Sequence, residues 1–377
     1  MFLGMTLWFS ATAATASIAA EFRLSQGETA WLTMAVQAGF VIGTLLSALM
    51  NLPDVLNARR LCATGCIVGA VANASLVEAG SSTALIALRA VTGVALAWVY
   101  PPGMKIAAGW FKDRRGAALG ILIGALTIGS AFPHLLAAVS AHIAWRTLML
   151  WASALAVAGG AVVITAVGDG PYVAASASFD PLAVARVFSA RGTRLATLGY
   201  LGHMWELYAV WTWIAAFASA ALSGVSRWET PPSTVSGSVV AFTLIASGAI
   251  GSAVAGIVAD RIGKARIATW AMLVSGTCAA MAGAVSGSPI LVAILAVIWG
   301  VAVVADSAQL SALVAEHSPH DHVGTALTVQ TCSGFLLTMA SIRLVPMVAR
   351  SIGWQWAFLC LVPGPFLGAL ALRGLRE

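Results

Sequence analysis

The stretch GHMWELYAVW, residues 202 to 211, carries a histidine and a glutamate three positions apart inside an apolar run. If the run is a helix, Glu206 lies about 17 Å from its start at Leu195, near the middle of a membrane, where an ionised carboxylate is costly. Such a group exchanges a proton near neutral pH, and His203, one turn away on the same face, can share it. We therefore predict proton coupling, and a structural hydrogen bond or direct contact with a substrate remain as alternatives.

A second acidic residue lies in the segment WGVAVVADSAQLSALVAE, residues 299 to 316. Helical spacing puts Asp306 on one face with Trp299 and Gln309. Asp306 is a candidate second titrating group of the proton-coupling set. The alternatives are a partner in an inner gate and a salt bridge to Lys105.

Arg89 is a basic residue inside an apolar run that ends in two prolines. It shares a helical face with Gly93 and Tyr100, and Pro101 and Pro102 then remove backbone donors, which predicts a kink facing a cavity. The fork of guanidinium donors suits a carboxylate or another planar anion. The alternative is a brace between helices.

Other candidate substrate contacts are aromatic, polar or basic residues at cavity depth. The tryptophans can stack on an organic ligand, and the two basic residues are expected near the outer side, where they would make a cavity electropositive. A charge-balancing pair with Glu206 is the alternative for the basic residues. The full set of substrate candidates is Arg89, Tyr100, Trp98, His134, Trp205, Trp213, Gln309 and Arg343.

The composition defines the class of protein that must position these residues. The chain has 377 residues, of which 60% are hydrophobic and only 9% charged, which excludes an ordinary soluble enzyme. The five cysteines show no metal-ligand spacing and suit packing. No phosphate-binding loop, metal site or nucleophile–base set is present, so we expect no enzyme activity, no cofactor and no nucleic-acid partner.

Apolar runs long enough to cross a bilayer as helices recur along the whole chain. The first starts almost directly at Met1, which is consistent with a short cytosolic leader ahead of it. The twelve predicted spans are 1–20, 31–50, 61–79, 82–111, 116–140, 146–167, 195–222, 234–259, 266–287, 289–314, 323–348 and 353–373.

The distribution of Lys and Arg predicts the orientation. With both termini in the cytoplasm, thirteen basic residues fall in inner segments and four in outer ones, as the positive-inside rule requires. The net charge of +6 is therefore a signal of topology.

The two halves of the sequence resemble each other. A shift of 207 to 209 residues aligns RGAALGILIG with VGTALTVQTC, AWRTLML with GWQWAFL and GVALAWVY with GVAVVADS. This repeat predicts two six-helix bundles, residues 1–167 and 195–377, joined by a cytoplasmic linker over 168–194, with a substrate site between them near the midplane.

The loop GIVADRIGKAR, residues 256 to 266, resembles the signature of the major facilitator superfamily, and RAVTG at residues 89 to 93 resembles the family's motif in its fourth helix. The resemblance implies an all-α membrane protein with twelve transmembrane helices in two pseudo-symmetric bundles, of bacterial type. It also implies a gating role for the loop and its first-half counterpart, at Asp54, Asp260, Arg261, Gly263, Lys264 and Arg266.

The combined expectation is a monomeric, proton-coupled secondary transporter in the bacterial cytoplasmic membrane. It would move a small organic anion by alternating access, with protons and the lipid bilayer as its other partners. The alternative is a proton-driven exporter of amphipathic drugs, in which the tryptophans stack on the drug and Glu206 recognises a cation. Neither a clustered reactive site nor a large soluble appendage supports a membrane enzyme or a sensor.

Overall fold

The structure is a computed structural model that describes residues 1–111, 115–139, 144–172, 180–223 and 234–375, without the side chains of residues 53, 54 and 115. Every regular element in this part of the chain is a helix, so the predicted all-α fold is confirmed. We call the elements α1 to α10 the N-terminal group and the elements α12 to α18 the C-terminal group.

The N-terminal group contains ten α-helices and a short 3₁₀ helix. Its elements are α1 (Phe2–Met5), α2 (Ser10–Ala13), α3 (Thr15–Phe22), α4 (Gln26–Leu49), α5 (Leu52–Val55), α6 (Ala58–Ala74), η1 (Ser75–Glu78), α7 (Ser82–Ala97), α8 (Tyr100–Trp110), α9 (Arg115–Val139) and α10 (Trp145–Ala166).

The C-terminal group follows a linker that includes η2 (Pro181–Ala183) and α11 (Val184–Val187). Its elements are α12 (Arg191–Ser223), α13 (Val235–Ile262), α14 (Lys264–Val285), α15 (Pro289–Ala305), α16 (Ser307–His317), η3 (His320–His322), α17 (Val323–Ile352), η4 (Trp354–Leu361) and α18 (Pro363–Leu372).

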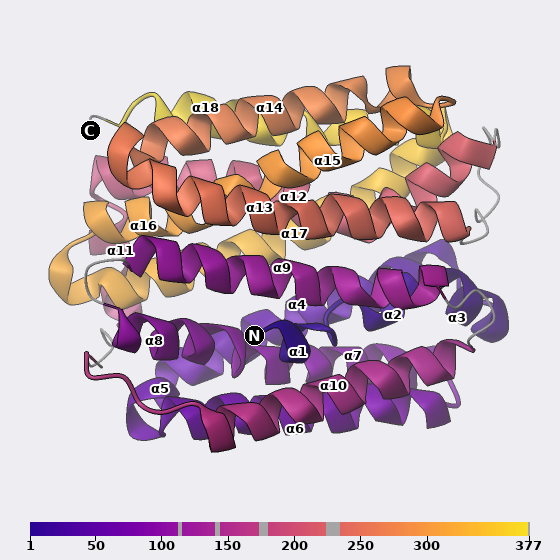
Figure 1. Cartoon of the computed structure of the whole chain (residues 1–377). Coiled ribbons are helices and arrows are strands. Elements are labelled where there is room, and N and C mark those ends of the chain that lie inside the picture. Colours follow the sequence, from indigo (N-terminus) through magenta and orange to yellow (C-terminus); the bar gives the residue numbers. More distant parts are fainter. Residues whose placement is uncertain (112–114, 140–143, 173–179, 224–233, 376–377) are drawn as a thin grey trace.

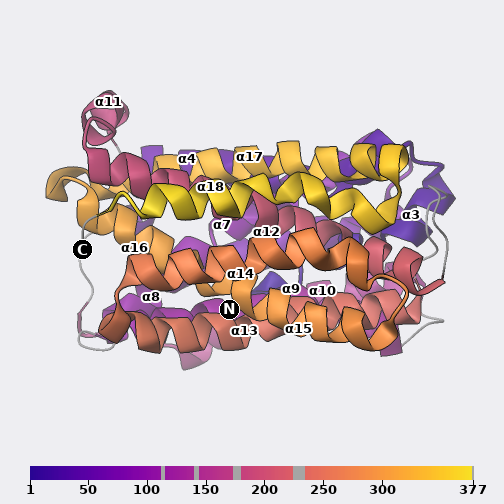
Figure 2. The same ribbon diagram turned by 90° about the horizontal axis from the view of Figure 1, so that it is seen from above.

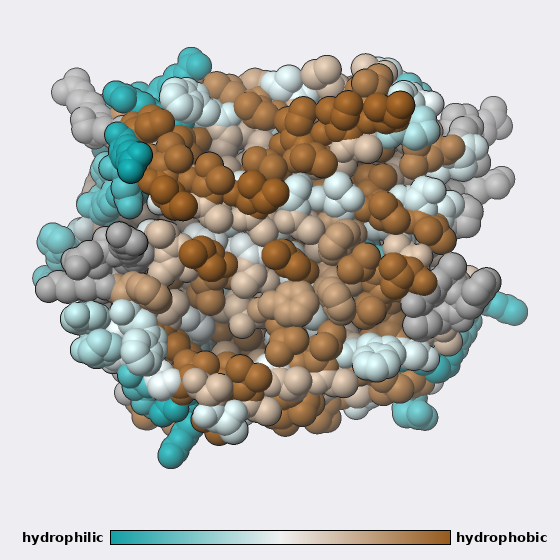
Figure 3. Space-filling model, in the orientation of Figure 1, coloured by the Kyte–Doolittle hydropathy of each residue, from teal (hydrophilic) through white to brown (hydrophobic). Residues whose placement is uncertain are grey.

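The long helices run roughly along one common direction, and the two groups lie side by side (Figure 1, Figure 2). Helix α9 packs along α13, and α4 packs along α17, so these two pairs join the groups. Hydrophobic residues cover the middle of the face seen in Figure 3, and hydrophilic residues gather toward its two ends. This distribution matches a bundle that crosses an apolar layer.

Ten helical segments of the described chain are long and apolar enough to cross a membrane, and they match ten of the twelve predicted spans. The other two predicted spans are the run of α1 to α3 and helix α12. Helix α12 is 33 residues long and carries polar residues, including His203 and Glu206, along its length. Its length still exceeds the roughly 20 residues that a crossing requires.

The prediction of one continuous helix over residues 1–20 is wrong. The segment consists of the three short helices α1, α2 and α3, and the N-terminus lies midway along the bundle (Figure 1). Between α1 and α2 the carbonyl groups of Leu7 and Trp8 accept hydrogen bonds from Arg89 of α7. A side chain from another helix thus satisfies the backbone groups that the break exposes.

Two longer spans are also broken, at equivalent places. The chain leaves the helix at Trp98 and Val99, between α7 and α8, and again at Asp306, between α15 and α16. Pro101 and Pro102 stand at the start of α8, where a missing N–H costs nothing, so the predicted kink is confirmed. Trp98 and Asp306 are 208 positions apart, which agrees with the offset of the sequence repeat.

Close glycine contacts repeat with the same offset. A Cβ atom on Gly93 would lie 2.2 Å from the carbonyl oxygen of Val36, and one on Gly300 would lie 1.9 Å from that of Leu244. Helices α4 and α7 therefore approach each other as closely as α13 and α15 do, through small residues at the crossing. The structure confirms the internal repeat at the level of individual contacts.

Candidate substrate and proton sites

Glu206 lies in a buried polar cluster of the C-terminal group. Its side chain is almost fully buried, with 1% of the residue exposed. One carboxylate oxygen accepts a hydrogen bond from Trp299 Nε1 at 2.8 Å, and the other accepts one from Ser275 Oγ at 2.7 Å. These bonds tie α12 to α14 and α15, so the structural contact left open by the sequence is present, and a proton-coupling role stays a prediction.

His203 faces Asp306, which stands at the break between α15 and α16. The Nδ1 atom of His203 lies 2.9 Å from Asp306 Oδ1, and both side chains are buried. The two atoms are in close contact, although this oxygen has no partner with full hydrogen-bond geometry among the described residues. The Nε2 atom of His203 lies 3.0 Å from Ser307 Oγ. The structure thus brings His203 to Asp306, where the sequence had paired it with Glu206.

Glu206, His203 and Asp306 together give the C-terminal group three titratable side chains that are shielded from water. An isolated buried charge is expensive, so the proton content of such a cluster is linked to its conformation. The sequence did not single out Ser275 and Ser307, because a serine in an apolar helix usually bonds its own backbone and gives no distinct signal.

Arg89 occupies an equally buried position in the N-terminal group. Its guanidinium donates to the carbonyl oxygens of Leu32 at 3.0 Å and Leu7 at 3.0 Å, and to that of Trp8. None of the residue is exposed. The fork of donors therefore joins α4 and α7 to the broken first segment, and these contacts favour the bracing interpretation over substrate contact.

A network of neutral polar groups extends from Arg89. Ser10 Oγ donates to Asn73 Oδ1 at 2.7 Å, and the same two oxygens lie 3.3 and 3.4 Å from Arg89 Nη1. The amide nitrogen of Asn73 donates in turn to Met149 O at 3.0 Å and to Ser153 Oγ at 3.1 Å. The network connects four elements, α2, α6, α7 and α10, and it contains no titratable acid.

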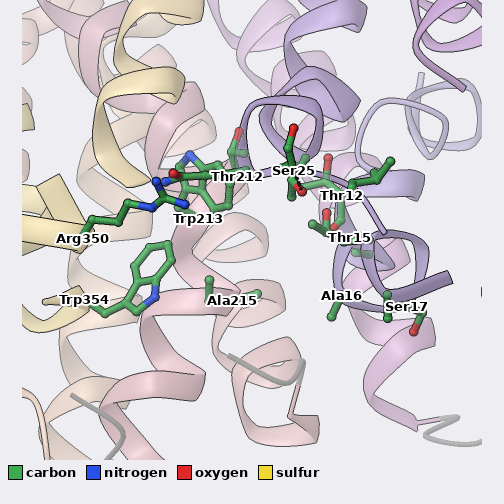
Figure 4. A pocket seen from close by; sticks show the side chains of 17 residues that line it. Thr12, Thr15, Ala16, Ser17, Ser25, Thr212, Trp213, Ala215, Arg350 and Trp354 are labelled. Carbon is green, nitrogen blue, oxygen red and sulfur yellow. Dashed lines mark hydrogen bonds between the residues drawn. The ribbon is translucent and has the colours of Figure 1, made fainter. Parts of the chain in front are cut away.

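A cavity of about 750 Å³ lies between the two groups, at the end of the bundle where α3 lies. Figure 4 shows hydroxyl groups of the N-terminal group, including Thr12, Thr15 and Ser25, facing Trp213, Trp354 and Arg350. Among the described residues that line it, none is acidic. These residues offer hydroxyls, indole rings and the guanidinium of Arg350, a set that suits a planar, polar and negatively charged molecule.

Aromatic rings from both groups fill the space next to this cavity. Trp8 and Phe40 lie against Phe335, with ring centroids 5.6 and 4.5 Å away. Tyr208 of α12 lies 5.5 Å from Trp8. In this conformation the two groups are in direct contact there.

The sequence profile of the Major Facilitator Superfamily matches residues 1–231 and 229–377, which is the whole chain. The chain belongs to this superfamily. A crystal structure of a mutant of the nucleoside transporter NupG is similar over 100% of this chain and 98% of that one, with a TM-score of 0.73 and 14% identity. This likeness shows the fold, and no curated protein matches the sequence. The protein is a membrane transporter and not an enzyme.

The superfamily loop between α13 and α14 lies where the groups meet, at the end of the bundle opposite the cavity. A Cβ atom on Gly116 would lie 3.6 Å from Asp260 Oδ1, so this carboxylate stands near the N-terminus of α9, where a negative charge is favourable. Gly263 has a φ of 103°, which lets the chain turn between the helices. Lys264 pairs with Glu316 at 2.6 Å.

The remaining gating candidates of the superfamily loop give less information. Arg261 and Arg266 are exposed, and Arg266 donates to the carbonyl of Ile262 at 3.5 Å. Asp54 of the first-half loop has a side chain outside the described part of the chain. The gating role of these residues stays a prediction.

The other substrate candidates lie at different places. Trp213 lines the cavity and donates to Ile342 O at 2.8 Å, whereas Trp205 donates to Cys360 O at 3.0 Å, inside the C-terminal group. Those that are not among the cavity-lining residues are Arg89, Trp98, Tyr100, His134, Trp205, Gln309 and Arg343.

Two of these candidates had been expected to make the cavity positive. His134 is fully buried, and Arg343 is exposed and packs against Gly27. Among the described residues, the basic one that lines the cavity is instead Arg350, which is one of the four basic residues that the sequence assigned to outer segments.

Proposed function

We propose that this transporter couples the movement of a small organic anion to that of protons, by alternating access of its two helix bundles. The observation that carries the proposal is the buried set of Glu206, His203 and Asp306 in one bundle. Groups that change charge within the apolar layer make conformational energies depend on proton binding. The orientation with both termini in the cytoplasm of a bacterium belongs to the same proposal.

The lining of the cavity supports an anionic substrate. Arg350 lines it, and the described part of its wall contains no acidic side chain. A guanidinium binds a carboxylate through two parallel hydrogen bonds, and the rings of Trp213 and Trp354 can stack on the rest of the molecule. The hydroxyl groups on the opposite wall can bond to further polar atoms.

The test begins with the purified protein reconstituted in vesicles. Anions that stabilise the protein against heat identify transported candidates, because a ligand that binds only the folded state raises its stability. Their uptake is then measured with and without an imposed pH gradient, in the native protein and in Glu206→Gln. We expect the variant to exchange labelled for unlabelled anion and to lose accumulation driven by the gradient.

The matched control is Glu78→Gln, which changes an exposed glutamate of the N-terminal group in the same way. It should accumulate substrate normally. Normal accumulation by Glu206→Gln would contradict the coupling role of this residue.

A nucleoside is a second candidate substrate. The cavity combines two tryptophans with several hydroxyl groups, which also suits a planar base attached to a sugar, and the similar structure is that of a nucleoside transporter. Uncharged nucleosides in the same thermal screen separate the two candidates. Stabilisation by amphipathic cations alone would instead favour drug export.

A further inference from the structure

Six aromatic side chains form a continuous cluster between the two groups. We call Trp8, Phe9, Phe40, Tyr208, Trp211 and Phe335 the aromatic cluster. The first three come from the N-terminal group and the last three from the C-terminal group. Phe9 stands 5.7 Å from Trp211, and Trp8 stands 5.0 Å from Phe40, between ring centroids. Each ring is at least nine-tenths buried.

The aromatic cluster continues the wall of the cavity. Thr12 and Thr212 line the cavity. Tyr208 lies one turn from Thr212 on α12, and Thr212 Oγ1 donates to the carbonyl oxygen of Tyr208 at 2.6 Å. On the other wall, Trp8 stands in the break that precedes α2, and its ring lies 5.5 Å from that of Tyr208.

Polar atoms without a hydrogen-bond partner lie within and beside the aromatic cluster. Among the described residues, the indole nitrogens of Trp8 and Trp211 have no acceptor, and both amide atoms of Gln37 are also unpartnered. All three residues are at most 2% exposed. Buried indole N–H groups and amides normally find partners, because an unpaired polar group away from water destabilises the folded protein.

The position of Gln37 relates it to the same cluster. The crossing of α4 and α7 uses Gly39, whose Cβ would meet Ala90 O. Gln37 precedes Gly39 by two residues, so it lies on the face of α4 turned away from α7. It also precedes Phe40 of the aromatic cluster by about one turn. We therefore count the Gln37 amide, with the two indoles, among the polar groups beside the aromatic cluster.

We propose that the aromatic cluster is a second binding station of the transport path, which takes the planar, conjugated part of an aromatic carboxylate when the two groups separate. This inference rests on the proposed anion transport and narrows its substrate class. The rings supply stacking faces from both groups, and the indole N–H groups with the Gln37 amide supply donors for carbonyl or carboxylate oxygens. A saturated acid of equal size and charge can use Arg350 in the cavity but not the stacking faces.

The experiment uses three probes of similar shape with the full-length protein in detergent. They are 2-naphthoate, the saturated decahydro-2-naphthoate and the uncharged 2-naphthamide. We expect 2-naphthoate to bind at least tenfold more tightly than its saturated analogue, as measured by calorimetry and by quenching of tryptophan fluorescence. Equal affinity for the two acids would contradict the second binding station, and the proposal of anion transport would be unaffected.

Binding of the naphthamide alone would have the opposite meaning for the two proposals. In that case the anion proposal fails, while an aromatic station for an uncharged ligand stands. Binding of none of the three probes, in a protein that does bind aliphatic carboxylates, would also overturn the station.

Variants assign the effect to the named groups. Trp8→Phe and Trp211→Phe keep a ring but remove one donor each, and Gln37→Met keeps the length of the side chain. Each should weaken 2-naphthoate binding about ten- to hundredfold, as expected for loss of one hydrogen bond to a charged group, with little change for the saturated acid. The control is Trp270→Phe on the exposed face of α14, which should change neither. Unchanged 2-naphthoate affinity in all three folded variants would contradict the proposal.

Discussion

The N-terminal group and the C-terminal group both bury charge within the apolar layer, but the chemistry of the two charges differs. Arg89 is a guanidinium, and backbone carbonyl oxygens accept its donors. Glu206, His203 and Asp306 belong to side-chain types that exchange protons. The contacts of Arg89 are those of a brace, whereas the proposed coupling role of the other three residues would make the C-terminal group respond to protons.

The brace at Arg89 has a structural reason. A helix broken inside a membrane exposes carbonyl groups that neither water nor lipid can satisfy. Arg89 supplies several donors in a rigid plane, and it reaches Leu7 and Leu32 on two different segments. A titratable side chain would be a poor substitute, because loss of its proton would leave those carbonyls without a donor.

The largest effect that tests this comparison is expected from Arg89→Ala. The carbonyls of Leu7, Trp8 and Leu32 would lose their donor, and the free energy of unfolding should fall by about 3 kcal/mol or more. Arg89→Lys keeps the charge but lacks the fork of donors, so its free energy of unfolding should lie between those of the native protein and Arg89→Ala. Thermal unfolding in detergent measures both, with the exposed Arg60→Ala as a control. If Arg89→Ala keeps its stability but no longer binds the substrate, Arg89 contacts the substrate and the bracing interpretation is wrong.

The next largest effect is expected from the contact between His203 and Asp306 in the C-terminal group. If His203 and Asp306 act as one unit, His203→Gln and Asp306→Asn should each lower gradient-driven accumulation by about tenfold, and the double variant should lower it no further. The measurement is uptake into vesicles under a fixed pH gradient. If the decrease in accumulation in the double variant equals the product of the two single decreases, the residues act independently.

A smaller effect is expected where the two groups meet near the superfamily loop. Asp260→Asn removes the negative charge that faces the N-terminus of α9, a contribution of about 0.3–1 kcal/mol. The conformation in which this end is open should gain population about two- to fivefold. Labelling of an introduced cysteine near α9 from that side should rise accordingly.

Glu316→Gln is the matched control for this change, because it breaks an ion pair made within the C-terminal group alone. It should leave the labelling unchanged. A rise of equal size in both variants would mean that the loop, and not the contact between the groups, is affected.

The smallest effect is expected for an exposed pair outside the spans. Two donors of Arg59 bond Asp169 at 2.9 and 3.0 Å, and this contact lowers the pKa of the Asp169 carboxyl below its ordinary value of 3.8. A lowered pKa in the folded state stabilises the protein above the ordinary value, and the contribution is lost as the pH falls through the folded value. Asp169→Asn should therefore reduce stability slightly at pH 7 and flatten its decrease in acid, which unfolding curves from pH 6 to 3 can measure.

The sequence predicts much of this fold, because apolar length and proline positions act locally. The kink before Pro101, ten of the spans and the repeat offset follow from runs of side chains alone. The break in the first segment could not be predicted in this way. It depends on the carbonyls of Leu7 and Trp8 meeting Arg89, which is about 80 residues away in the chain, and only tertiary structure brings them together.

The sequence predicts which types of residue form the candidate site better than it predicts which of these residues contact each other. Glu206, His203 and Asp306 stand out because charge is rare in apolar runs. Helical spacing then pairs His203 with Glu206, but Asp306 comes closer because α15 ends beside α12. Arg350 was missed for a similar reason, since a basic residue at the end of a helix normally faces water or lipid headgroups, and only the packing of two bundles turns this one toward a cavity.

The two helix breaks at Trp98 and Asp306 have a mechanical meaning. Rigid rods interrupted at equivalent places act as two hinges, one in each half of a molecule whose halves have similar shapes. One hinge carries a neutral indole and the other a carboxylate that contacts an imidazole. We therefore expect the two breaks to bend with unequal ease, because the contact with His203 ties the second one to α12. Two halves of nearly equivalent shape would then move to different extents.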